Sequence, residues 1–283
     1  MIAVSRRGTL VRIALLRGDV LAEYHLWNQA APDGVGDLYT GRVDAVMPGL
    51  AGRFVSLGEE TGFLPDSAGG KTLTTGTYAA FRVTRAAQGG KGPRLAAAAE
   101  PCGTTPGLLR SGPGPLLELA TRLPGEPILL DDYALMAALR PVLEGHMRHS
   151  TQAFDPVLED ELAALAEPSA ALPHGARLHI TPTPAATLLD MDAASASDMP
   201  PLSLNNAVIP EICRQILLRN LSGGILIDFA GMKPAAREKL GPALRQALKA
   251  DPLHPEFLGF SHLGFAELTR RRIRPPLHEI IAP

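Results

Sequence analysis

Three aspartates stand at the ends of apolar runs in the second half of the sequence. Asp190 and Asp192 close the run ATLLDMD, and Asp228 closes the run GGILID. Side chains two residues apart on a strand point the same way, and parallel strands end at one edge of a sheet. We therefore expect two or three of these carboxylates to meet at that edge. Ionised carboxylates this close repel each other unless a cation lies between them.

Mg²⁺ suits such a site, because it binds one or two carboxylates, keeps several waters and accepts substrate phosphate oxygens. The chemistry that these residues favour is metal-assisted hydrolysis of a phosphodiester, in which the ion polarises the phosphate and activates a water. The alternative is that each aspartate only caps the loop after its strand. The residues alone leave both interpretations open.

The surrounding sequence predicts the elements that would position these aspartates. Apolar residues at four-residue spacing predict a helix over 205–221, which precedes an apolar strand over 224–229. From about residue 116 onward, strand and helix patterns alternate, which indicates an α/β unit. Short β-rich runs over 38–84 predict a small antiparallel barrel, and two runs joined by a glycine turn predict a hairpin over 9–27.

Composition limits the classes of protein to consider. The 283 residues are 46% hydrophobic and 20% charged, as in a globular rather than a disordered chain. No apolar run is long enough to span a membrane, and the N-terminus lacks a signal-peptide pattern. Cys102 and Cys213 form no CxxC pair, so we expect a cytoplasmic protein without disulfides. With a net charge of −2, any RNA binding must come from local basic patches.

Several stretches together resemble the ribonuclease E/G family of bacterial endoribonucleases. They occur in the family's order, with gaps, over most of the chain. The stretches are LYTGRVDAVMPGLAGRFVSLGEETGFLP (38–65), LLDMDAAS (188–195), EICRQILLRNLSGGILIDFAGM (211–232) and LGFAELTRRRIRPPLHE (263–279).

The resemblance implies a multidomain α/β fold: an RNase H-like scaffold with an inserted OB-fold β-barrel, followed by a DNase I-like α/β catalytic domain. The RNase H-like scaffold is expected to combine two separate segments of the chain, 1–35 and 116–167. The other expected divisions are the OB-fold RNA-binding domain (36–97), a linker (98–115) and the DNase I-like catalytic domain (168–283).

The resemblance also implies roles for the aspartates. In the family, two aspartates hold the catalytic Mg²⁺, and they correspond to Asp190 and Asp228. Asp192 stands where the family has an asparagine that orients the site. The extra negative charge either tightens metal binding or misplaces the attacking water, and the sequence does not decide between these outcomes.

RNA-binding residues follow from the same resemblance. Phe54 and Phe63 correspond to two phenylalanines that contact single-stranded RNA, and Lys91 lies in a basic glycine loop that the family uses near RNA. A basic run that would suit a phosphate backbone consists of Arg270, Arg271, Arg272 and Arg274. The alternatives are that the two rings pack inside the barrel and that the basic side chains are simply solvated.

Two features of the family have no counterpart in the sequence. The Gly/Pro-rich stretch 98–115 leads directly into a helix, so we expect no 5′-monophosphate sensor, and no cysteine pair for a zinc-linked dimer follows the basic run. A homodimer of another kind stays open. The first hypothesis is a Mg²⁺-dependent endoribonuclease acting on single-stranded RNA in RNA processing or decay. The second is a family member that binds RNA without cutting it.

Overall fold

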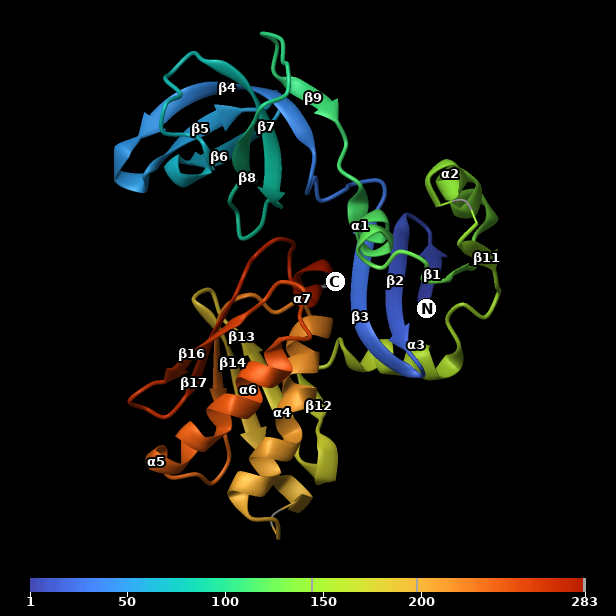
Figure 1. Cartoon of the computed structure of the whole chain (residues 1–283), viewed down its shortest axis with the longest axis vertical. Coiled ribbons are helices and arrows are strands. Elements are labelled where there is room, and N and C mark those ends of the chain that lie inside the picture. Colours follow the sequence, from blue (N-terminus) through green and yellow to red (C-terminus); the bar gives the residue numbers. More distant parts are fainter. Residues whose placement is uncertain (144, 197, 282–283) are drawn as a thin grey trace.

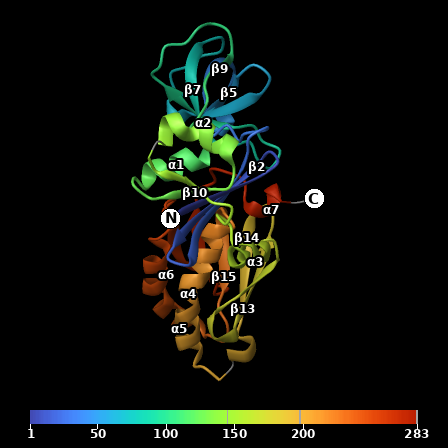
Figure 2. The same cartoon turned by 90° about the vertical axis from the view of Figure 1, so that its right-hand side faces the viewer.

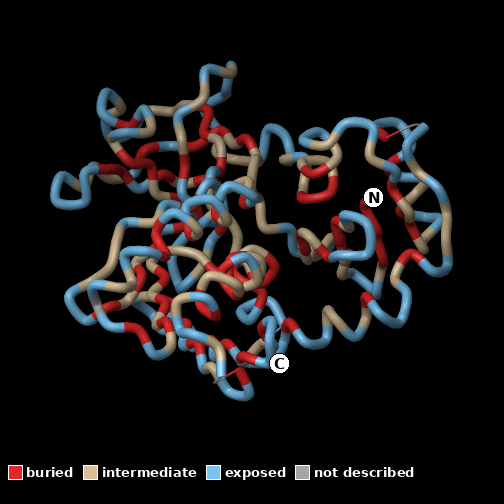
Figure 3. The backbone as a smooth tube through the Cα atoms, turned by 60° about the horizontal axis from the view of Figure 1, so that its bottom comes forward, coloured by how far each residue is buried: buried red, intermediate tan, exposed pale blue. Residues whose placement is uncertain are grey.

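Three β-sheets organise the chain. A computed structural model describes residues 1–143, 145–196 and 198–281. The protein is mixed α/β, with a β-barrel at one end of the long axis, a third sheet at the other, and the first sheet beside them (Figures 1 and 2). Figure 3 shows that buried residues gather within these bodies, while the connecting loops are largely exposed. Among the described residues, no helix is long and apolar enough to cross a membrane.

The first sheet joins two regions that are far apart in the sequence, in the order β11-β10-β1-β2-β3. The predicted hairpin is confirmed as β2 and β3, whose turn contains Gly18 at a φ of 60°, a conformation that glycine adopts readily. β10 and β11 then extend the sheet in parallel from β1. The elements of this body are β1 (Ile2–Arg7), β2 (Leu10–Arg17), β3 (Val20–Asn28), α1 (Gly114–Arg122), β10 (Ile128–Leu130), α2 (Tyr133–Leu143), β11 (Met147–His149) and α3 (Pro156–Ala164).

The predicted small barrel is present, inserted between β3 and α1. Five strands form a closed, OB-like barrel, because β4 pairs with both β5 and β7. Residues Gly107–Arg110, inside the stretch predicted as a linker, instead form a strand that pairs with the start of β4. The strands are β4 (Leu38–Met47), β5 (Gly52–Ser56), β6 (Thr61–Pro65), β7 (Tyr78–Arg85), β8 (Arg94–Ala98) and β9 (Gly107–Arg110).

The two connections to the barrel run close together. Gly112 N donates a hydrogen bond of 2.6 Å to Asp37 Oδ1. A Cβ atom on Gly112 would lie only 2.3 Å from the carbonyl oxygen of Val35, so glycine is needed for this close approach. The entering and leaving segments of the barrel therefore meet in a narrow neck.

The third sheet has the order β12-β13-β14-β15-β17-β16, and only β14 and β15 are parallel neighbours. The long helix α4 connects these two strands, and its predicted apolar face is confirmed, because Val208, Ile212 and Ile216 are buried. The elements are β12 (Ser169–Ala171), β13 (Arg177–Pro182), β14 (Ala186–Asp192), α4 (Pro201–Leu218), β15 (Gly223–Asp228), α5 (Pro234–Arg237), α6 (Gly241–Leu248), β16 (Glu256–Phe260), β17 (Ala266–Arg270) and α7 (Leu277–Ile280).

Helices cover one face of this third sheet. α4 and α6 pack on the face that carries Leu189 and Ile227, and Figure 2 shows β13 and β14 on the opposite side from these helices. Alternate residues of β14 are exposed, namely Leu188, Asp190 and Asp192. The sheet therefore presents one open face, and the carboxylates of β14 lie on it.

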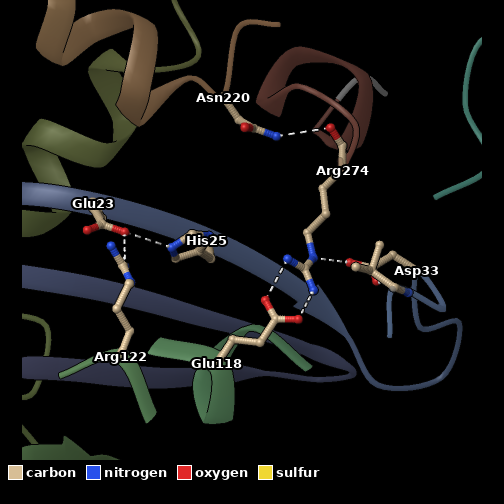
Figure 4. Close-up of polar contacts among 8 residues, drawn as sticks. Glu23, His25, Asp33, Glu118, Arg122, Asn220 and Arg274 are labelled. Atoms are coloured by element: carbon tan, nitrogen blue, oxygen red, sulfur yellow. Dashed lines mark hydrogen bonds and ion pairs between the residues drawn. The ribbon is translucent and has the colours of Figure 1, made fainter. Parts of the chain in front are cut away.

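The segment after β17, residues 271–281, joins the three bodies; we call it the C-terminal arm. Arg274 of the arm bonds to Glu118 of α1 at 2.8 and 2.9 Å and to Asp33 of the loop after β3 at 2.6 Å (Figure 4). Burial alone would lower the pKa of the Arg274 guanidinium, but its bonds to Glu118 and the charge of Asp33 raise that pKa above its usual value. Asn220 Nδ2 also donates to the Arg274 carbonyl, at 3.1 Å.

We expect Arg274→Met to destabilise the folded chain, because it leaves two partly buried carboxylates without their partner. Loss of one partner from a buried ion pair costs about 3–5 kcal/mol. Asp33 and Glu118 retain some exposure, so we expect a loss of about 2–3 kcal/mol in urea denaturation. The exposed Arg148→Met is the matched control. Equal unfolding midpoints for the two variants would contradict the role of Arg274.

Candidate functional site

The three aspartates lie at one edge of the third sheet. Asp190 and Asp228 are register partners on the parallel strands β14 and β15, whose backbones run roughly 4.8 Å apart. Register partners on neighbouring strands project from the same face, and Asp192 follows one pleat further along β14. Asp190 and Asp192 are exposed, and 43% of the Asp228 side chain is accessible. The sheet thus places these three aspartates at one edge and on one face.

An arginine that no sequence pattern singles out contacts Asp228. Arg237, the last residue of α5, places Nη1 3.0 Å from Asp228 Oδ1. The same guanidinium donates to the carbonyl oxygens of Met232 and Gly264. A Cβ atom on Gly264 would lie 2.6 Å from Arg237 Nη1, so the glycine makes room for this contact. Arg237 therefore fixes one oxygen of Asp228 and offsets its charge.

Basic residues also face the other two aspartates across the β13–β14 pair. His179 is the register partner of Asp190, and Arg177 is the register partner of Asp192. Both basic residues are exposed on the open face. Asp192 Oδ1 accepts a 2.9 Å hydrogen bond from Ala194 N, so this carboxylate also fixes the turn that follows β14. Each of the three acids thus has a basic residue beside it.

The two carboxylates suit a cation that keeps most of its water ligands better than a cation enclosed by protein ligands. Asp190 and Asp228 supply two carboxylates at one strand edge, which is the number that Mg²⁺ typically takes from a protein. Among the described residues, no group of three or more His, Cys, Asp or Glu side chains is arranged to hold a metal ion. Mg²⁺ at this edge would therefore keep most of its waters.

Phe54 and Phe63 form an aromatic pair on the barrel surface. They are register partners on β5 and β6, and their ring centroids lie 5.7 Å apart at an interplanar angle of 66°. Phe54 is 36% exposed and Phe63 is half-buried. The barrel core consists of other residues: Val43, Val55, Leu57, Leu64, Phe81, Val83 and Leu95. The alternative that both rings fill the core is therefore wrong.

The predicted basic residues divide into two groups. Lys91 and Arg272 are both exposed, and they line one pocket between the β7–β8 loop of the barrel and the C-terminal arm. Arg270 is only 3% exposed, and its guanidinium bonds to Asp251 Oδ2 at 2.6 Å and to Asn220 Oδ1 at 2.7 Å. The prediction that Arg270 contacts RNA is wrong, because its donors are engaged by contacts inside the fold.

Comparisons with known proteins group the aspartate-bearing region of the chain with bacterial ribonucleases. The model of the ribonuclease E/G family matches residues 134–273. Ribonuclease E of Nostoc sp. is 33% identical over 121 residues, which are 40% of this chain and 18% of that protein. Ribonuclease E of Escherichia coli is 30% identical over 128 residues, 43% of this chain and 12% of that protein. Ribonuclease G of Escherichia coli is 32% identical over 130 residues, 44% of this chain and 27% of that protein.

These matches cover only a portion of the site. The similarity spans only 12–27% of the length of the three relatives named. The family match includes Asp190, Asp192 and Asp228 but begins after the barrel, which ends at Arg110. The two phenylalanines and Lys91 therefore lie outside it.

Gly52 positions the aromatic pair, and we expect Gly52→Ala to disturb it. A Cβ atom there would lie 2.4 Å from Phe63 Cζ and 2.8 Å from the carbonyl oxygen of Leu64. Overpacking of this kind costs about 1–3 kcal/mol, so the free energy of unfolding should fall by that amount. Gly49→Ala is the control, because nothing lies within 4 Å of its Cβ position. If both variants unfold at the same urea concentration, the close contact at Gly52 is refuted.

Proposed function

Because the chain belongs to the ribonuclease E/G family, we propose that it is an endoribonuclease that hydrolyses single-stranded RNA with the help of Mg²⁺. The observation that carries this proposal is the register pairing of Asp190 with Asp228. Both residues lie at or near the ends of parallel strands at an accessible edge, within the segment that matches the family. Chemistry on a polymer needs such an open site, because the substrate must cross it.

Asp190 and Asp228 are the residues that would hold Mg²⁺, which when bound polarises the scissile phosphate and lowers the pKa of a water. Arg237 holds Asp228 in a fixed position through Oδ1. It also reduces the repulsion between the two carboxylates before a cation arrives. Asp192 keeps the turn after β14 in place through its bond to Ala194 N. An asparagine could make the same bond, so this contact does not depend on the charge.

In this proposal, the barrel provides most of the contacts that bind the RNA. Bases stack on exposed aromatic rings at roughly 1–3 kcal/mol each, and the Phe54–Phe63 pair offers such a surface. Lys91 and Arg272 add positive charge for the phosphate backbone. We extend the proposal to the fold: residues 1–35 with 116–167 as the RNase H-like scaffold, and 168–283 as the DNase I-like domain. Support for the division is that separate sheets form from these segments.

A specific observation favours the second candidate function, RNA binding without cleavage. Arg237 already offsets the charge of Asp228, one of the two proposed metal ligands, and Arg177 is the register partner of Asp192. This compensation weakens the attraction for a divalent cation. A protein of this kind would bind RNA through the barrel surface. The aspartates at the strand edge would contribute neither to RNA binding nor to cleavage.

The first test is cleavage of an unstructured RNA in the presence of Mg²⁺. We expect the wild type to cut the RNA and both Asp190→Asn and Asp228→Asn to reduce the rate at least about a hundredfold, because each removes a ligand charge. EDTA should abolish cleavage by the wild type. Asp19→Asn, in the exposed turn between β2 and β3, should cut like the wild type. RNA left intact by the wild type would favour the binding-only function.

The second test concerns the aromatic pair and uses EDTA to prevent cleavage. Phe54→Ala should weaken binding of a single-stranded RNA by about 1–3 kcal/mol, because it removes a stacking surface. Leu50→Ala removes an exposed apolar side chain from the same barrel without removing a ring, and it should bind like the wild type. Fluorescence anisotropy at several salt concentrations gives both affinities. A Phe54→Ala variant with wild-type affinity would exclude stacking at this position.

A further inference from the structure

A basic pocket of about 380 Å³ lies between the barrel and the third sheet, apart from the aspartates. Its walls come from the β7–β8 loop, the β13–β14 turn and the C-terminal arm. Thr187 of β14 lines it, three residues before Asp190 and thus roughly 10 Å away along the strand. The pocket therefore belongs to the start of β14 and β15, whereas the aspartates belong to their ends.

Positive charge dominates the walls of this pocket. Arg85, Lys91 and Arg272 line it, together with a single carboxylate, that of Glu279. Burial lowers the pKa of the Arg85 guanidinium, and the positive charges of Arg94 and Arg272 lower it further. Within the described part of the chain, Arg85, Lys91 and Arg272 make no ion pair within 4.0 Å. Their charges are therefore not neutralised by the protein itself.

Two buried hydrogen-bond donors in the pocket walls have no partner among the described residues. They are Arg85 Nε and Gln88 Nε2. A buried N–H group without an acceptor costs about 1–3 kcal/mol, so folded proteins rarely retain one without a reason. Both donors belong to residues that line the same cavity. An anion in the pocket would supply the missing acceptors once these side chains turn toward it.

The backbone fixes the basic groups in position. Ala86 N donates a 2.8 Å hydrogen bond to the carbonyl oxygen of Ile273, so the neighbours Arg85 and Arg272 are held at the same junction. Gly223 begins β15 at a φ of 84°, and a Cβ atom there would lie 2.3 Å from Arg272 Nη2. The glycine thus provides the space in which the Arg272 guanidinium lies.

We propose that this pocket binds a phosphate group, through the guanidinium groups of Arg85 and Arg272, the ammonium group of Lys91 and the amide of Gln88. Guanidinium groups match the geometry of phosphate oxygens and are the groups of choice for binding them. The phosphate comes either from a small phosphorylated molecule or from an RNA chain, and the second source rests on the proposed function. Binding at the pocket needs neither Mg²⁺ nor the aspartates.

The experiment measures two ligands in EDTA, so that cleavage plays no role. Binding of inorganic phosphate is followed by phosphorus NMR at constant ionic strength, and binding of a labelled short RNA by anisotropy over a salt series. Arg272→Gln and Arg85→Gln should each weaken phosphate binding about tenfold. Gln88→Glu, which adds a negative charge to the pocket, should weaken it at least as much. The exposed Arg148→Gln, outside the pocket, is the matched control.

Each pattern of results decides the proposal. Loss of phosphate affinity alone assigns the pocket to small phosphorylated molecules. Loss of RNA affinity, with a salt slope reduced by about one, assigns it to a backbone phosphate. Wild-type affinity for both ligands in all three variants overturns the proposal, as does a wild type that binds neither ligand. Arg272→Lys should restore some of the affinity, and thermal melts establish that each variant is folded.

The outcome is independent of the cleavage test. A chain that binds phosphate here yet leaves RNA intact refutes the proposed nuclease and retains the pocket. A chain whose Arg272→Gln and Arg85→Gln variants cut RNA at the wild-type rate and bind both phosphate and RNA with wild-type affinity retains the nuclease and loses the pocket.

Discussion

One guanidinium links segments of all three bodies, in addition to the apolar packing between α4 and the first sheet. Arg274 lies between carboxylates of Glu118 and Asp33, which belong to α1 and to the loop that leads into the barrel. Because the arm that carries Arg274 also hydrogen-bonds to the barrel through Ile273, a single short segment sets where the barrel stands over the third sheet. The basic pocket exists only in that arrangement, because its walls come from both bodies.

The strand edge of the third sheet shows how a chain can gather negative charge without unfolding. β14 and β15 are in parallel register, which brings Asp190 beside Asp228. The repulsion is limited because the carboxylates remain accessible to water and because Arg237 bonds to one of them. The same features that make the site tolerable also moderate its attraction for a cation. The two proposed functions, RNA cleavage and RNA binding without cleavage, thus differ by a small balance of charges around three acids.

Much of the arrangement was predictable from local patterns in the sequence, and the exceptions share one cause. The helix over 205–221 and the strand that ends at Asp228 were predictable, because periodicity and glycine signals are local. The burial of Arg270 was not predictable, because its ion-pair partner, Asp251, lies in a loop 19 positions earlier in the sequence. Arg237 likewise meets Asp228 only because α5 folds back against the β16–β17 hairpin. Ion pairs between residues far apart in the sequence leave no periodic pattern from which they could be predicted.

The neck at Gly112 and Asp37 has an evolutionary consequence. The chain segments that enter and leave the barrel touch there. The barrel is therefore an insertion whose two ends lie side by side in the fold. A lineage could gain, lose or exchange such an insertion by recombination without rearranging the hydrophobic core on either side. The barrel can therefore diverge in sequence without disturbing the segments on either side of it.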